Sequence, residues 1–225
     1  GGQDLPSPHH EDEIAQAGGA GYGFARYWMH NGFVNIEDEK MSKSLGNFFT
    51  LREIFCDFHP LAVRFFLLSV HYKAPLNFTR EALEQAESAL RRFNDFILRL
   101  QEAAGQGREA GAPSAGTAGA VDRARAGFQE GMDDDMNVSR SLAALAELVR
   151  DVNARLDRAS LSPADASTLL DFFREVDQVL GVFTFGRGVL PGEIVTIAHS
   201  WFIRSKSLYR LWVPMFSSPM AMAET

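Results

Sequence analysis

The stretch EDEKMSKSLGNFFT, residues 37–50, marks the point at which the sequence pattern changes from strand to helix. The preceding run FVNI (33–36) is short, apolar and alternating, which is typical of a strand. From Leu51 onward, apolar residues recur at helical spacing. The stretch between them is rich in Lys and Ser, as a solvated turn often is. Two ammonium groups beside hydroxyls also suit a polyphosphate from which pyrophosphate leaves, so both interpretations stay open at this point.

The composition bounds the class of protein. The chain has 225 residues, of which 46% are hydrophobic, enough for one large domain or two small ones. A net charge of −7 argues against a nucleic-acid binder that works by bulk charge, although a local basic surface stays possible. The lone cysteine, Cys56, rules out an internal disulfide and favours a reducing cytoplasmic compartment.

The sequence predicts no membrane-spanning segment. No apolar segment reaches the length of a membrane span, and no charged-then-apolar leader opens the chain. The chain begins at Gly-Gly-Gln-Asp, and it closes on a segment without a clear helical or strand period. We therefore expect that neither end is a natural domain boundary.

The first third of the sequence predicts a small α/β unit. Residues 1–16 indicate a glycine turn and then a helix start, with Pro8 at the first helical position and three acidic residues near the positive end of the helix dipole. Residues 24–36 predict an aromatic-rich helix end, a stop at Asn31-Gly32 and then the strand. After Leu51, Pro60 separates two helical segments, of which the second is strongly apolar.

The rest of the sequence predicts a helix bundle. Thr79 has the position of an N-cap before a long amphipathic run, in which Phe93 and Phe96 are expected to be core residues. Residues 105–120 have the composition of a flexible linker. Further helices are predicted at about 121–130, 137–157 and 163–182. The predicted fold class is thus an α/β piece followed by an all-α antiparallel helix bundle.

Two groups of residues near the N-terminus have the chemistry of binding sites. His9 and Glu13 lie four residues apart at a helix start, so they share one face and form a competent half of a zinc site. Acidic residues placed only for the helix dipole are the plainer alternative. Gly1, Gly2 and Asp4 suggest a turn that lets a ligand approach closely, although a simple glycine turn is more common.

Several motifs together carry a resemblance. KMSKS (40–44) is the signature of class I aminoacyl-tRNA synthetases, and its continuation SLGNFFTLREIF, the upstream YWMHNGFV and above all PHHEDEIAQ (8–16) closely resemble the cysteinyl-tRNA synthetases. The later MDDDMNVSRSLAAL (132–145) resembles the anticodon-stem domain of that family. The resemblance covers about residues 1–185, and its motifs are spaced as the family has them.

This resemblance implies roles for particular residues. Lys40, Ser42 and Lys43 match the catalytic signature, and Lys43 matches the lysine that contacts ATP, with Lys40 as its electrostatic neighbour. Gly2 and Asp4 match the segment that lines the aminoacyl-adenylate pocket.

The resemblance also implies a metal site. His9 and Glu13 match two ligands of a Zn²⁺ ion whose cysteine ligands lie upstream, and the zinc is expected to bind the substrate thiolate. His10 is expected to be structural or to support the ligands. Cys56 is not marked as a ligand.

The resemblance further implies organisation and activity. Residues 1–72 correspond to the C-terminal part of a Rossmann-like catalytic domain, residues 73–185 to a helical, DALR-like tRNA-binding bundle, and residues 186–225 to a divergent tail. The complete enzyme would use ATP with Mg²⁺ to activate cysteine and would transfer it to tRNA(Cys), as a cytoplasmic monomer. The upstream ATP motif and zinc cysteines are not in the chain, so we expect the chain alone to be inactive.

Two alternative functions stay open. A related ligase joins activated cysteine to an amino sugar, and a non-catalytic tRNA-binding module is a rival of another class.

The sequence departs from the family pattern at a few positions. Pro6-Ser7 replaces a segment that usually carries a bulky apolar residue, and Met136 and Val138 stand where the family usually has Phe and Thr. The tail carries Arg204, Lys206 and Arg210, which could touch RNA, but a disordered or misread tail is favoured.

Overall fold

The computed structural model describes residues 1–36, 39–40, 50–105 and 111–186. The chain divides into the units Gly1–Phe185 and Gly186–Thr225, and the description below concerns the first. The expected tail at 186–225 lies outside the described residues apart from Gly186. The elements are η1 (Pro6–His10), α1 (Glu11–Gly19), β1 (Val34–Ile36), β2 (Glu39–Lys40), α2 (Leu51–Asp57), α3 (Pro60–Ser69), β3 (Leu76–Asn77), α4 (Arg80–Ala104), α5 (Ala115–Asp133), α6 (Val138–Leu156) and α7 (Pro163–Leu180).

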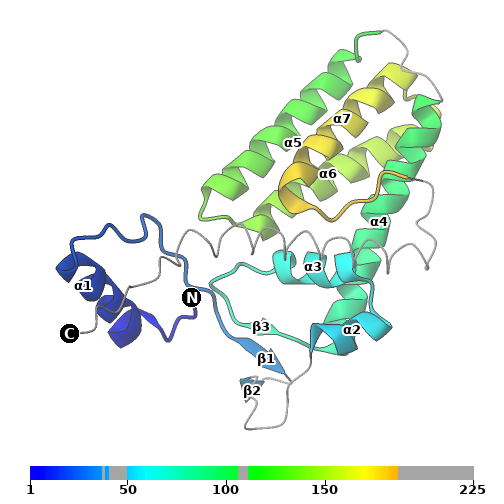
Figure 1. Cartoon of the computed structure of the whole chain (residues 1–225). Coiled ribbons are helices and arrows are strands. Elements are labelled where there is room, and N and C mark those ends of the chain that lie inside the picture. The colour runs from blue at the N-terminus through cyan, green and yellow to red at the C-terminus, as the bar shows by residue number, and fades with distance from the viewer. Residues whose placement is uncertain (37–38, 41–49, 106–110, 187–225) are drawn as a thin grey trace, which may run out of the picture. The chain divides into compact units, whose positions relative to one another are not determined.

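A small sheet forms the centre of the α/β part. Its strand order is β2-β1-β3, with β2 antiparallel and β3 parallel to β1. The register pairs Val34 with Leu76 and Asn35 with Lys40. The strand predicted before the Lys/Ser stretch is therefore confirmed, and its parallel partner comes from the segment that precedes α4 (Figure 1).

Helices α2 and α3 follow this sheet region and are separated as the sequence predicts. The Thr50 hydroxyl accepts a hydrogen bond from the Glu53 amide, and the Glu53 carboxylate accepts one from the Thr50 amide, so a capping box begins α2. Extended backbone at Phe58 and His59 ends α2, and Pro60 then occupies the first turn of α3, where its missing N–H costs nothing.

The bundle consists of α4, α5, α6 and α7, which lie side by side in Figure 1. The hydroxyl of Thr79 caps α4 by accepting from the Ala82 amide, as the sequence predicts. Phe93 and Phe96 are buried, which confirms them as core residues. Helix α3 packs against α4 and α6, so the hydrophobic core is continuous from the α/β part into the bundle.

The start of α5 differs from the prediction. The helix expected at 121–130 begins at Ala115 and runs to Asp133, so residues 115–120 of the expected linker are helical. The reason is long-range: the Asp165 carboxylate accepts hydrogen bonds from the amide and the hydroxyl of Ser114, at 2.8 and 2.9 Å, and the Ser114 hydroxyl caps the helix at Thr117. Residues 106–110 of the linker lie outside the described part of the chain.

The N-terminal helix also differs from its prediction. Regular helix begins at Glu11, so Pro8 lies in the preceding turn η1 and not at the first position of α1. The helix ends at Gly19, and residues 22–30 form no helix, so the aromatic-rich helix end expected there is wrong. Glycines surround this end, and Gly21 has a positive φ of 77°, which favours a turn over a continued helix.

Asp165 supports a prediction about stability. Burial raises the pKa of this carboxyl, but hydrogen bonds from Ser114, Thr117 and Ser162 outweigh it and lower the pKa to about 2. A lowered pKa means that the stabilisation is complete above the unfolded value of 3.8 and is lost as the pH falls through about 2. Asp165→Asn should therefore lower the free energy of unfolding by about 2 kcal/mol at pH 7, as measured by urea denaturation.

Measuring the two free energies of unfolding again at pH 2 tests whether the lowered pKa of Asp165 is the cause. The difference between the parent chain and Asp165→Asn should become small there, because a pH equal to the folded pKa of about 2 leaves only about 0.4 kcal/mol of this stabilisation. Asp171→Asn is the matched control, since Asp171 forms an exposed pair with Arg174 three residues away on the same helix. This control should change stability by less than about 0.5 kcal/mol at either pH. An equal loss in the two variants would contradict the prediction.

Candidate functional site

The glycine turn at the N-terminus pairs with the segment that enters β1. Gly2 forms a parallel bridge with Asn31, in which the Gln3 amide donates to the Asn31 carbonyl at 3.1 Å and the Asn31 amide donates to the Gly1 carbonyl at 2.9 Å. A Cβ atom on Gly2 would lie 2.5 Å from Oδ1 of Asp4. The structure thus brings the predicted Gly2 and Asp4 together, and only glycine leaves room for this carboxylate position.

His9 and Glu13 lie on one continuous helical stretch. His9 is in η1, Glu13 is in the first turn of α1, and the backbone at His10 and Glu11 between them is helical. Both side chains are exposed, and their i, i+4 spacing puts them on one face. Among the described residues no group of three or more His, Cys, Asp or Glu side chains could hold a metal. Imidazole and carboxylate suit zinc, so these two residues fit half of a zinc site.

His10 is held by an aromatic cluster instead. Its Nδ1 lies 2.9 Å from Nε2 of His30, and its ring centroid lies 4.9 Å from that of Trp28. Desolvation lowers the pKa of His30, and the neighbouring His10 and the N-terminal ammonium group lower it further. The structure therefore gives His10 a packing role, with neutral imidazole favoured at His30.

The KMSKS stretch is anchored at both ends by described elements. On its N-terminal side, Lys40 belongs to β2 and pairs in register with Asn35 of β1. On its C-terminal side, Thr50 begins α2 through the capping box. The side chain of Lys40 and the whole of Ser42 and Lys43 lie outside the described residues, so the predicted catalytic lysines are located only by these anchors.

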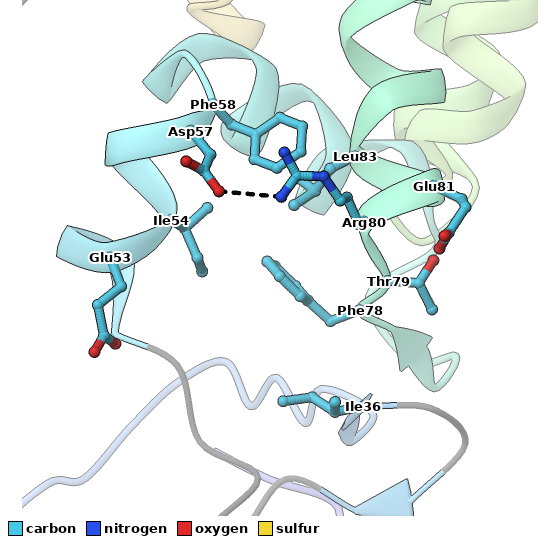
Figure 2. Close-up of a pocket in the computed structure, with 10 residues that line it drawn as sticks. All are labelled: Ile36, Glu53, Ile54, Asp57, Phe58, Phe78, Thr79, Arg80, Glu81 and Leu83. Carbon is cyan, nitrogen blue, oxygen red and sulfur yellow. Dashed lines mark hydrogen bonds and ion pairs between the residues drawn. The ribbon is translucent and has the colours of Figure 1, made fainter.

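A pocket of about 430 Å³ lies between α2, the end of β1 and the start of α4. Figure 2 shows Ile36, Ile54 and Phe78 around the hollow, with the Asp57–Arg80 ion pair at 3.1 Å beside it. The remaining lining residues are Glu53, Phe58, Thr79, Glu81 and Leu83. Sequence reasoning did not predict this pocket, because its walls come from three elements that only the fold brings together.

Comparison with known proteins places these features in a family. Residues 1–88 match the "tRNA synthetases class I (C) catalytic domain", and residues 127–184 match the "DALR domain". The chain is similar to the class I tRNA synthetases over these two ranges. It carries a segment of the catalytic domain, with the small sheet, followed by the DALR helical domain, which confirms the predicted fold class.

The relatives agree with this placement. Cysteine–tRNA ligase of Pelotomaculum thermopropionicum is 44% identical over 189 residues, which are 81% of this chain and 39% of the relative. Cysteine–tRNA ligase of Caldicellulosiruptor saccharolyticus is 41% identical over 207 residues, which are 88% of this chain and 43% of the relative. The chain thus spans about two fifths of the length of these relatives.

A solved structure shares the fold at greater distance. The agnB2 LeuRS of Agrobacterium radiobacter K84, solved in a ternary complex with tRNA and LeuAMS, superposes with a TM-score of 0.54 at 21% identity. The match covers 68% of this chain and 21% of that one, and it concerns the fold alone. In the described part of the class I segment and the DALR domain, no helix is long and apolar enough to cross a membrane.

Gly32 provides a test of how the site is assembled. This buried residue enters β1, and its amide donates to the Tyr72 carbonyl at 2.7 Å. A Cβ at this position would press on the backbone carbonyl of Ala74 and lie 2.9 Å from the carbonyl oxygen of Lys73. Backbone atoms cannot move away cheaply, so Gly32→Ala should lower the free energy of unfolding by about 1–3 kcal/mol in urea denaturation.

The control for Gly32→Ala is a glycine in open space. Gly116 lies in α5, and a Cβ there would meet nothing within 4 Å. Gly116→Ala should therefore stabilise the chain by about 0.5–1 kcal/mol, since alanine loses less conformational entropy in a helix. Equal free energies of unfolding for Gly32→Ala and the parent chain would contradict the prediction that the backbone of Lys73 and Ala74 leaves no room for a Cβ at Gly32.

Proposed function

We propose that this chain is part of a cysteine–tRNA ligase, which activates cysteine with ATP to cysteinyl-adenylate and transfers it to tRNA(Cys). The observation that carries the proposal is the identity of 41–44% to proteins of that name over more than four fifths of the chain. The match to a DALR domain after the catalytic segment supports tRNA as the acceptor rather than an amino sugar.

In this proposal the KMSKS stretch supplies the charge that the first step needs. Negative charge moves to pyrophosphate as the cysteine carboxylate attacks the α-phosphorus of ATP with its Mg²⁺. Lys40 and Lys43 would stabilise that charge, and the Ser42 hydroxyl would donate to it. The capping box at Thr50 and the pairing of β1 with β2 support this role, because they fix the two ends of the stretch.

Gly2 and Asp4 would bind the nucleotide in this proposal. The absence of a side chain at Gly2 lets the Asp4 carboxylate lie against the turn, since a Cβ there would be 2.5 Å from its Oδ1. That carboxylate can accept a hydrogen bond from a sugar hydroxyl. We assign Gly2 and Asp4 to binding of the adenylate on these grounds.

His9 and Glu13 would provide two ligands of a zinc ion, with two further ligands outside this chain. When bound, zinc supplies a soft Lewis acid that prefers the cysteine thiolate to the serine hydroxyl. The exposed i, i+4 arrangement supports this assignment, because both side chains are free to turn toward one metal. A cytoplasmic, monomeric enzyme belongs to the same proposal, and the free thiol of Cys56 is compatible with that compartment.

A chimera tests the ligase proposal directly. The stretch of the Pelotomaculum thermopropionicum relative that matches this chain is replaced by the corresponding residues of this chain, and cysteine-dependent ATP–pyrophosphate exchange and tRNA charging are measured. We expect both activities in the chimera and neither in the 225-residue chain alone. Lys43→Ala in the chimera should reduce exchange by about 10²–10³-fold, since one charge-stabilising group is lost.

Arg123→Ala is the matched control, because Arg123 is an exposed cation of α5. It should leave pyrophosphate exchange within about twofold of the parent chimera, as surface substitutions usually do. Charging of an amino sugar in place of tRNA would overturn the choice of acceptor. Tight tRNA binding without any exchange would favour the non-catalytic binding module.

The zinc assignment has its own test. The chimera should contain about one zinc per chain by mass spectrometry, and His9→Ala should remove most of it, because a four-ligand site loses one of its donors. Glu11→Ala, an exposed acidic neighbour in the same turn, should leave the zinc content unchanged. A full complement of zinc in His9→Ala would contradict the assignment.

A further inference from the structure

The turn between α5 and α6 has an unusual backbone. Asp135 and Met136 both have positive φ angles, 53° and 54°, in a region that L-residues other than Asn and Asp rarely adopt. Hydrogen bonds fix this turn, with the Asn137 amide donating to Gly131 and the Asn137 side chain capping α6 at Arg140. The turn therefore holds the Asp135 side chain at a defined place outside the bundle.

The Asp135 carboxylate contacts the loop between α3 and β3. Its Oδ1 accepts a hydrogen bond from the Tyr72 hydroxyl at 2.7 Å, and its Oδ2 accepts one from Lys73 Nζ. Nε2 of His71 lies 3.9 Å from the same Oδ2. One carboxylate of the DALR domain thus accepts hydrogen bonds from two consecutive side chains of the catalytic segment and lies near a third.

The same loop holds the candidate site through its backbone. The Tyr72 carbonyl accepts from the Gly32 amide at 2.7 Å, where the chain enters β1. The Lys73 carbonyl accepts from Nε2 of Gln3 at 2.6 Å, between Gly2 and Asp4. Two adjacent residues therefore connect Asp135 with the entry to β1 on one side and with the glycine turn on the other.

We propose that Asp135 is a positioning residue, through which the DALR domain sets the place of the adenylate-binding turn and of the strand that leads to KMSKS. The proposal rests on the function proposed above for those two segments. Asp135 touches neither substrate nor metal in this account. It acts by fixing the side chains of Tyr72 and Lys73, whose carbonyls then fix Gly32 and Gln3.

Exposure distinguishes this role from simple stabilisation. The side chains of Lys73 and Asp135 are 54% and 45% exposed, and ion pairs at that exposure contribute little to the free energy of unfolding. Hydrogen bonds from Lys73 and then Tyr72 lower the pKa of Asp135, so the carboxylate is ionised at neutral pH. The contact therefore mainly fixes the positions of the Tyr72 and Lys73 side chains, and a measurement on individual residues can detect its loss.

The test measures amide hydrogen exchange in the full 225-residue chain. Asp135→Asn keeps the backbone conformation, since Asn also tolerates a positive φ, but it removes the charge that holds Lys73. Exchange at the Gly32 and Gln3 amides should become about tenfold faster, while amides within α5 and α6 stay within about twofold of the parent. Tyr72→Phe should give a smaller change in the same direction, and Lys73→Arg should preserve the slow exchange.

Glu175→Gln is the matched control. The Glu175 carboxylate pairs with Arg125 at 2.6 Å on the bundle surface, at a similar exposure, so its loss should leave Gly32 and Gln3 unchanged. Unchanged exchange at Gly32 and Gln3 in Asp135→Asn would overturn the proposal. Equal acceleration throughout α5 and α6 would also overturn it, because the role would then be structural only.

The chimera described above separates this inference from the ligase proposal. If the chimera is active, Asp135→Asn should lower the kcat of pyrophosphate exchange about tenfold with little change in tRNA affinity, and Glu175→Gln should not. If the parent chimera shows no exchange, the ligase proposal fails, whereas the amide-exchange result still decides the coupling between Asp135 and the N-terminal turn.

Discussion

The apolar face of α3, packed against α4 and α6, is the contact on which the rest of this structure depends. Val63, Phe65 and Phe66 are almost completely buried there, and the ring of Phe65 lies 6.1 Å from that of Phe93 in α4. Because α3 is strongly apolar, it cannot be stable as an exposed helix of a small α/β segment. It therefore belongs physically to the bundle and connects the sheet to it.

Polar contacts from the middle and from the C-terminal end of α3 fix how this helix is oriented on the bundle. Nε of Arg64 donates to the Leu180 carbonyl at 2.7 Å, where α7 ends at Gly181 with a positive φ of 62°. The Ser139 hydroxyl donates to the Ser69 carbonyl at 2.7 Å, where α3 ends beside α6. Apolar packing alone would let α3 slide or rotate, whereas these hydrogen bonds define one docking position.

The sequence predictions succeeded where an element depends on neighbouring residues and failed where it depends on residues far along the chain. Local signals sufficed for α4, since Thr79 caps it and its apolar residues repeat at helical spacing, and for β1. The start of α5 could not be predicted, because it depends on Asp165, far along the chain. The same holds for the site: a motif located the KMSKS stretch, but no local pattern indicates that Tyr72 and Lys73 hold the glycine turn.

The shared use of Asp165 by two helices has a consequence for how the linker between α4 and α5 can change. One carboxylate caps α5 through Ser114 and α7 through Ser162, so the first turn of α5 is attached to α7. The free energy of closing a longer loop rises only with the logarithm of its length. Insertions between residues 105 and 111, such as an affinity tag or a small domain, should therefore leave the bundle in register.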